Sequence, residues 1–136
     1  MAEKTIIETI LQFYPQAQAV YLFGSYGTDS ERTDSDIDIA LLLPFSQAKQ
    51  EPALSQSPCK SALEAALGRI VDLINLRMAN TVFQNEILNT ARLLLIQDEA
   101  ETAGFEMTVL SAYQKLTEER REILESFYQT KRAYQV

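Results

Sequence analysis

Acidic residues are concentrated in one short part of this 136-residue chain. Four of its six Asp residues lie between positions 29 and 38, and two of them form the sequence Asp36-Ile37-Asp38. Because side chains alternate along a strand, Asp36 and Asp38 would point to the same side of one, about 6–7 Å apart. Carboxylates this close repel each other unless a cation lies between them, and hard oxygen ligands suit Mg²⁺. The pair therefore predicts a magnesium site.

A glycine and a serine precede this pair by ten residues. Gly24-Ser25 follows the β-prone segment 18–23, at the point where a strand would end in a loop. Glycine lets the backbone approach a ligand closely. The Ser25 hydroxyl and the neighbouring amides would together bind a phosphate. A phosphate site facing a metal-binding carboxylate pair is what a nucleotide–Mg²⁺ complex requires.

A third carboxylate, Asp72, is the one acid in the apolar segment 69–76. An acid inside an apolar strand is costly unless it is paired or binds a cation. If this strand lies beside the one that carries Asp36 and Asp38, three carboxylates could hold two metal ions about 3.5–4 Å apart, for displacement at phosphorus. Asp72 could also accept the proton of an attacking hydroxyl. The alternative is a structural acid that pairs with a nearby Arg or faces solvent.

Hydrophobic periodicity predicts the elements that must position these residues. Apolar residues at helical spacing between 99 and 132 include Val109, Leu110, Tyr113, Leu116, Ile123, Leu124 and Phe127. Segment 46–57 is polar and is expected to be the loosest part of the chain. The whole pattern predicts one α/β (α+β) domain over 1–136, a small sheet flanked by helices, with C-terminal helices from about residue 99. We expect helices over 3–14, 58–67, 80–90 and 99–132, and strands over 18–23, 36–43, 69–76 and 92–96.

Composition excludes several classes of function. The chain has no His, which excludes a Ser-His-Asp triad and a His-ligated zinc site, and its single Cys59 cannot form an internal disulfide. A net charge of −7 argues against nucleic-acid binding and against a polybasic membrane contact. The N-terminus does not resemble a signal peptide and the apolar runs are too short to span a bilayer. We therefore expect a cytoplasmic protein.

The motif Gly24-Ser25-x10-Asp36-x-Asp38, followed by Asp72 on a later strand, resembles the DNA polymerase β-type nucleotidyltransferase superfamily. The short chain is similar to its minimal nucleotidyltransferase (MNT) branch, and more narrowly to the antitoxins of HEPN/MNT toxin–antitoxin modules. The resemblance implies a small mixed sheet flanked by helices. It also implies that Gly24 and Ser25 bind the β- and γ-phosphates of ATP, that Asp36 and Asp38 coordinate Mg²⁺, and that Asp72 completes a catalytic carboxylate triad.

The reaction implied by the resemblance is AMPylation, the transfer of AMP from ATP to a hydroxyl with release of pyrophosphate. The implied acceptor is a tyrosine of a cognate HEPN ribonuclease toxin, which the antitoxin would neutralise in a hetero-oligomer. The sequence departs from the usual family pattern at Gly27-Thr28-Asp29, where a basic residue and a second glycine are often found. Two alternatives therefore stay open: an antitoxin that neutralises its partner by binding alone, and a nucleotidyltransferase acting on a small molecule.

Overall fold

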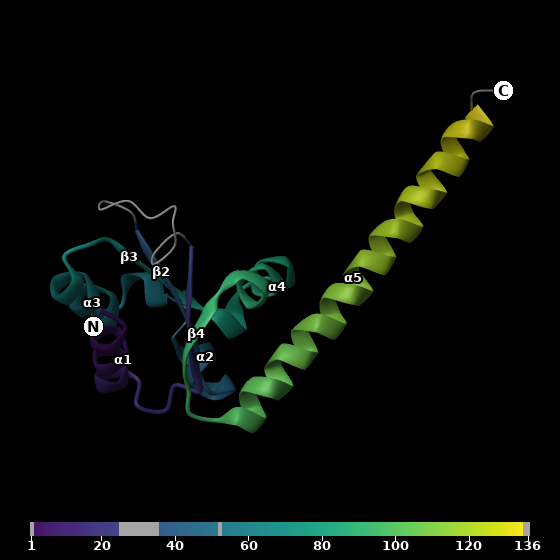
Figure 1. Ribbon diagram of the computed structural model, residues 1–136. Coiled ribbons are helices and arrows are strands. Elements are labelled where there is room, and N and C mark those ends of the chain that lie inside the picture. Colours follow the sequence, from purple (N-terminus) through teal and green to yellow (C-terminus); the bar gives the residue numbers. More distant parts are fainter. Residues whose placement is uncertain (1, 25–35, 52, 135–136) are drawn as a thin grey trace.

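The computed structural model describes residues 2–24, 36–51 and 53–134, with side chains described as far as residue 129. Four strands form one sheet in the order β3-β2-β1-β4 (Figure 1). Strand β1 runs antiparallel to both β2 and β4, whereas β2 and β3 are parallel. The mixed sheet and its flanking helices confirm the predicted fold class. The strands are β1 (Ala19–Phe23), β2 (Ile37–Leu42), β3 (Val71–Asn75) and β4 (Arg92–Ile96).

Helices cover both faces of this sheet, as the alternation of its side chains requires. On β2, Ile37 and Ile39 face a core that includes residues of α1 and α3, whereas Ala40 faces a core that includes residues of α4 and α5. Both isoleucines are fully buried. The helices are α1 (Ala2–Phe13), α2 (Phe45–Gln50), α3 (Pro58–Leu67), α4 (Thr81–Thr90) and α5 (Glu99–Tyr134).

The boundaries of α3 show how local sequence sets one element. Ser57 precedes the helix and its hydroxyl accepts a hydrogen bond from the backbone N–H of Lys60, while Pro58 is the first helical residue. Gly68 ends the helix with φ = +66°, a left-handed conformation that favours glycine. Local sequence thus sets both ends of α3.

The prediction that segment 46–57 is loose is wrong. It contains α2 and a short 3₁₀ turn, and it buries Ala48 and Leu54. The Asn75 amide at the end of β3 donates hydrogen bonds of 2.9 Å to the carbonyls of Ala48 and Glu51. These long-range contacts, which no local pattern reveals, hold the segment against the edge of the sheet.

Helix α5 has two parts with different surroundings. Its first turns lie against the sheet, where Phe105 and Val109 are buried, and the Tyr21 hydroxyl donates a 2.8 Å hydrogen bond to Glu106. The Arg77 guanidinium lies 5.3 Å from the Phe105 ring centroid. Beyond this junction the helix projects away from the rest of the molecule (Figure 1). Within the described residues, no helix has the length and apolar character needed to cross a membrane.

Candidate functional site

Two of the predicted carboxylates are neighbours across the sheet. Because β2 and β3 pair in parallel, Asp38 lies directly opposite Asp72. Adjacent strands are about 4.8 Å apart, so both side chains rise from one small area. Asp38 is partly buried and Asp72 is exposed. The expectation that the two strands lie side by side, which brought Asp72 into the site, is confirmed.

Gly24 packs against one of these carboxylates. It directly follows Phe23, which pairs with Asp38 across β1 and β2. Its φ is +78°, and a Cβ built on it would overlap Oδ2 of Asp38. Only glycine fits here without displacing the carboxylate or straining the backbone. The glycine predicted for a phosphate site thus also leaves room for the Asp38 side chain.

Asp36 and Ser25 are the other two residues predicted for this site. Asp36 is exposed and lies just before β2, whose first residue, Ile37, donates a 2.9 Å hydrogen bond from its backbone N–H to the carbonyl of Ile70. Ser25 lies outside the described residues. The placement of Ser25 as a phosphate ligand therefore stays a prediction.

The electrostatics of the site favour a bound cation. Partial burial raises the pKa of Asp38, and the nearby carboxylates of Asp72 and Asp36 raise it further. Each of these effects disfavours the charged form of an acid that has no positive partner. A divalent cation between Asp38 and Asp72 would relieve the repulsion between them.

The donor set fits Mg²⁺ when a nucleotide is present. Asp38 and Asp72 offer hard oxygen ligands, and Mg²⁺ in nucleotide sites takes one or two carboxylates together with water and phosphate oxygens. However, the described part of the chain holds no group of three or more acidic or cysteine side chains arranged to bind a metal ion by themselves. The residues thus fit a metal ion that arrives with its phosphate ligands rather than one held by a closed triad.

Glu64 positions the strand that carries Asp72, and sequence reasoning missed it. Its carboxylate accepts a 3.0 Å hydrogen bond from the backbone N–H of Val71, the residue before Asp72. The Lys60 ammonium lies 3.1 Å from the same carboxylate. The hydrogen bond from Val71 and the pairing with Lys60 lower the pKa of Glu64. Lys60 thus supports this anchor of β3.

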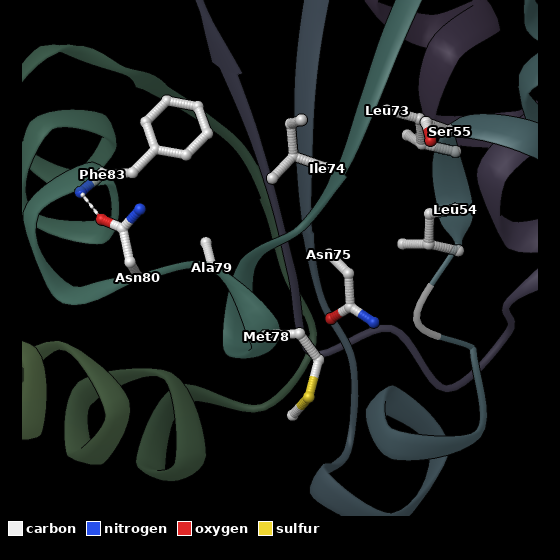
Figure 2. Close-up of a pocket in the computed structure, with 9 residues that line it drawn as sticks. All are labelled: Leu54, Ser55, Leu73, Ile74, Asn75, Met78, Ala79, Asn80 and Phe83. Carbon is white, nitrogen blue, oxygen red and sulfur yellow. Dashed lines mark hydrogen bonds between the residues drawn. The ribbon is translucent and has the colours of Figure 1, made fainter.

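A cavity of about 370 Å³ borders the second half of β3, from Leu73 to Asn75 (Figure 2). Ile74, on the same side of β3 as Asp72, borders it. The Oδ1 atom of Asn75 is buried there without a hydrogen-bond partner. The cavity is as large as small-ligand pockets, which begin at about 300 Å³. It is lined by Leu54, Ser55, Leu73, Ile74, Asn75, Met78, Ala79, Asn80 and Phe83.

Cys59 takes no part in this site. It is a fully buried residue of α3, and burial raises the pKa of its thiol to about 11. A thiol in that state is a poor nucleophile at neutral pH.

Comparison with known proteins agrees with this arrangement. Residues 4–100 match the family described as polymerase beta, nucleotidyltransferase. The protein adenylyltransferase MntA of Shewanella oneidensis is 32% identical over 123 residues, which are 90% of this chain and 85% of that protein.

Solved structures of toxin–antitoxin complexes have a similar fold. A crystal structure of a toxin–antitoxin with AMP-PNP matches with a TM-score of 0.72 and 30% identity, over 93% of this chain and 98% of that one. A complex of a tri-AMPylated Shewanella oneidensis HEPN toxin with an MNT antitoxin matches with a TM-score of 0.67 and 30% identity, over 92% and 94% of the two chains. Sequence, fold and the placement of the carboxylates agree: the chain belongs to the polymerase beta nucleotidyltransferase family.

Proposed function

We propose that this chain is an antitoxin that transfers AMP from ATP to a tyrosine hydroxyl of a cognate HEPN ribonuclease toxin and thereby neutralises it. The observation that carries the proposal is the register of Asp38 and Asp72 on adjacent strands, packed against Gly24. The relatives described as a protein adenylyltransferase and as toxin–antitoxin complexes support the choice of nucleotide and partner.

The proposed roles follow from the chemistry of each residue. Gly24 and Ser25 would bind the β- and γ-phosphates of ATP. Asp38 and Asp72, joined by Asp36, would hold Mg²⁺, which when bound offsets the negative charge of the phosphates. Asp72 is exposed on its strand and so can accept the proton of the attacking tyrosine hydroxyl.

The transfer forms one bond and breaks one bond at the α-phosphorus of ATP. The tyrosine oxygen attacks the α-phosphorus of ATP and forms a new P–O bond. The bond from that phosphorus to the oxygen bridging the α- and β-phosphates breaks, and pyrophosphate leaves. The chain's own contribution is to orient the triphosphate, to concentrate negative charge where the metal ion binds, and to take up the proton.

The cavity along β3 suits the acceptor, since Ile74 borders it two residues after Asp72 on the same side of the strand. An aromatic acceptor needs an apolar surface close to the reacting oxygen, and Ile74, Met78 and Phe83 provide one. We assign this cavity to the acceptor tyrosine or to residues that flank it.

Intact mass spectrometry tests the proposal. The product of the neighbouring open reading frame is incubated with this chain, ATP and Mg²⁺, and its mass is measured. We expect a gain of one or more AMP units with the wild-type chain and none with Asp36→Ala/Asp38→Ala. Glu86→Gln, an exposed acid on α4, is the matched control and is expected to leave the gain unchanged.

An alternative is neutralisation by binding alone, which the departure at Gly27-Thr28-Asp29 leaves open. In that case the partner's mass would stay constant with both chains, while its ribonuclease activity stayed suppressed by wild type and by Asp36→Ala/Asp38→Ala alike. That result would replace AMP transfer with simple binding.

A further inference from the structure

We call residues 110–134 of α5 the outer helix. Several of its large apolar side chains are exposed. Ile123 is 67% exposed, Phe127 59% and Leu124 55%, whereas Val109, one residue before the outer helix, is 3% exposed. Exposed apolar patches of this kind mark interaction sites in soluble proteins. A helix without tertiary packing is also only marginally stable in water. The outer helix therefore has the properties of a docking surface.

The spacing of residues along the outer helix indicates which kind of surface it can pack against. Five residues follow one another at alternating intervals of three and four along α5: Tyr113, Leu116, Arg120, Ile123 and Phe127. We call these five residues the seam. Alternating intervals of three and four place side chains on one face, which packs as knobs into the holes of another helix. The seam thus fits a helical surface with its own apolar stripe.

The distribution of charge separates the outer helix from the rest of the molecule. Residues 1–109 contain 7 basic and 15 acidic side chains, a net charge of −8, whereas residues 110–136 contain 5 basic and 4 acidic ones, a net charge of +1. The outer helix is therefore less acidic than the rest of the chain, and a basic side chain such as Arg120 can pair with a carboxylate of a partner.

Arg120 makes a second copy of this chain a poor occupant. It occupies a central position of the seam, and a parallel pair of outer helices would place two Arg120 side chains against each other. Like charges in such a seam destabilise the pair. A partner with a carboxylate at that position would instead form a salt bridge.

The solved relatives share most of this helix. The complex with the HEPN toxin matches over 92% of this chain, so about 11 residues lie outside the match. Helix α5 has 36 residues. Most of α5 therefore belongs to the fold that those antitoxins share.

We propose that the outer helix is the docking arm for the toxin. Its seam packs against an apolar stripe on a helix of that protein, and Arg120 pairs with a toxin carboxylate. The identity of the partner rests on the proposed function, whereas the docking surface rests on the exposure, spacing and charge of α5.

Calorimetric titration of the partner, without ATP, tests this surface. The double variant Ile123→Asp/Phe127→Asp is expected to weaken binding at least 100-fold. Gln114→Asp/Gln129→Asp adds the same two charges at exposed positions outside the seam, and should change binding by less than 3-fold. Arg120→Glu, which keeps a helix-forming residue, should weaken binding at least 10-fold. Circular dichroism checks that each variant keeps its helix.

The outcomes separate this inference from the proposed function. Binding by Ile123→Asp/Phe127→Asp within 3-fold of wild type overturns the docking arm, even where AMP transfer is observed. Loss of binding only in the seam variants supports the arm, even where the wild-type chain transfers no AMP. A wild-type chain that does not bind the partner, or that forms a dimer dissociated by Ile123→Asp/Phe127→Asp while partner binding survives, overturns the proposal.

Discussion

The outer helix and the part of the sheet around Asp38 and Asp72, which we call the carboxylate edge, are stabilised in different ways. At the carboxylate edge, strand register places Asp38 opposite Asp72, Gly24 packs against Asp38, and Glu64 holds the backbone before Asp72. The outer helix, in contrast, presents apolar side chains such as Ile123 to solvent. One region has its geometry set by contacts within the chain, and the other presents a surface that a partner would complete.

The difference corresponds to two different tasks. Phosphoryl transfer depends on groups already placed before the substrate arrives, because reorganisation in the reaction raises the barrier. Docking needs apolar surface that becomes buried only in the complex. This chain places catalysis and docking in separate regions. The two regions meet at the junction formed by Tyr21, Glu106 and Phe105.

Hydrogen exchange should show the largest contrast between the two regions. Backbone amides of β1 and β2 are hydrogen-bonded at the centre of the sheet, whereas those of the outer helix depend on one isolated helix. We expect protection factors in the strands at least about 10³-fold higher than in residues 110–129 of the chain alone. Adding the toxin should raise protection in the outer helix. Equal protection in both regions before toxin is added would contradict the contrast.

Gly24→Ala should damage the carboxylate edge alone. The new methyl group would overlap Asp38 and the residue would keep a positive φ, so AMP transfer should fall at least about 100-fold, with a stability loss of about 1–3 kcal/mol. Toxin affinity should stay within 3-fold of wild type. The measurements are single-turnover transfer, thermal unfolding and calorimetric titration.

Two other glycines provide matched controls for that variant. Gly68→Ala has the same kind of positive φ but open space around the new methyl group, so it tests backbone strain without the clash. Gly104→Ala lies within α5 in open space and should stabilise the helix by about 0.5–1 kcal/mol. If Gly68→Ala reduced AMP transfer as strongly as Gly24→Ala, the close approach to Asp38 would not be the cause.

Tyr21→Phe should produce the smallest effect, at the junction. It removes the 2.8 Å hydrogen bond to Glu106 and should lower the free energy of unfolding by about 1 kcal/mol. The rate of AMP transfer at saturating toxin should not change, since Tyr21 pairs with Ala40 on β2 and not with Asp38. Glu106→Gln, which keeps an acceptor oxygen, should cost less stability. A fall in the saturating rate would mean that the junction couples the two regions.

Much of the carboxylate edge could be predicted from the sequence because its signals are local. Asp72 interrupts an otherwise apolar strand, and Gly24 follows a β-prone segment at a fixed distance before Asp36 and Asp38. The contact of Gly24 with Asp38 and the anchor formed by Glu64 could not be predicted. Both depend on which residues meet once the strands pair, and no periodicity encodes that.

The helices show where pattern alone is insufficient. The apolar stripe of α5 was predicted from the sequence. The exposure of Ile123 was not predicted, because a buried helix and a partner-binding helix have the same 3.6-residue period. Helix α2 was missed because its six residues are polar apart from Phe45 and Ala48. Its stability depends on contacts such as the Asn75 hydrogen bond to the carbonyl of Ala48, far away in the sequence.

The most direct test is single-turnover AMP transfer measured as a function of toxin concentration. We predict that Asp38→Asn lowers the saturating rate at least about 100-fold without changing the half-saturating toxin concentration, since one metal-binding carboxylate is lost. Arg120→Glu should raise the half-saturating concentration at least 10-fold and leave the saturating rate unchanged. If Arg120→Glu lowered the saturating rate, or Asp38→Asn changed only the half-saturating concentration, the separation of catalysis from docking would be contradicted.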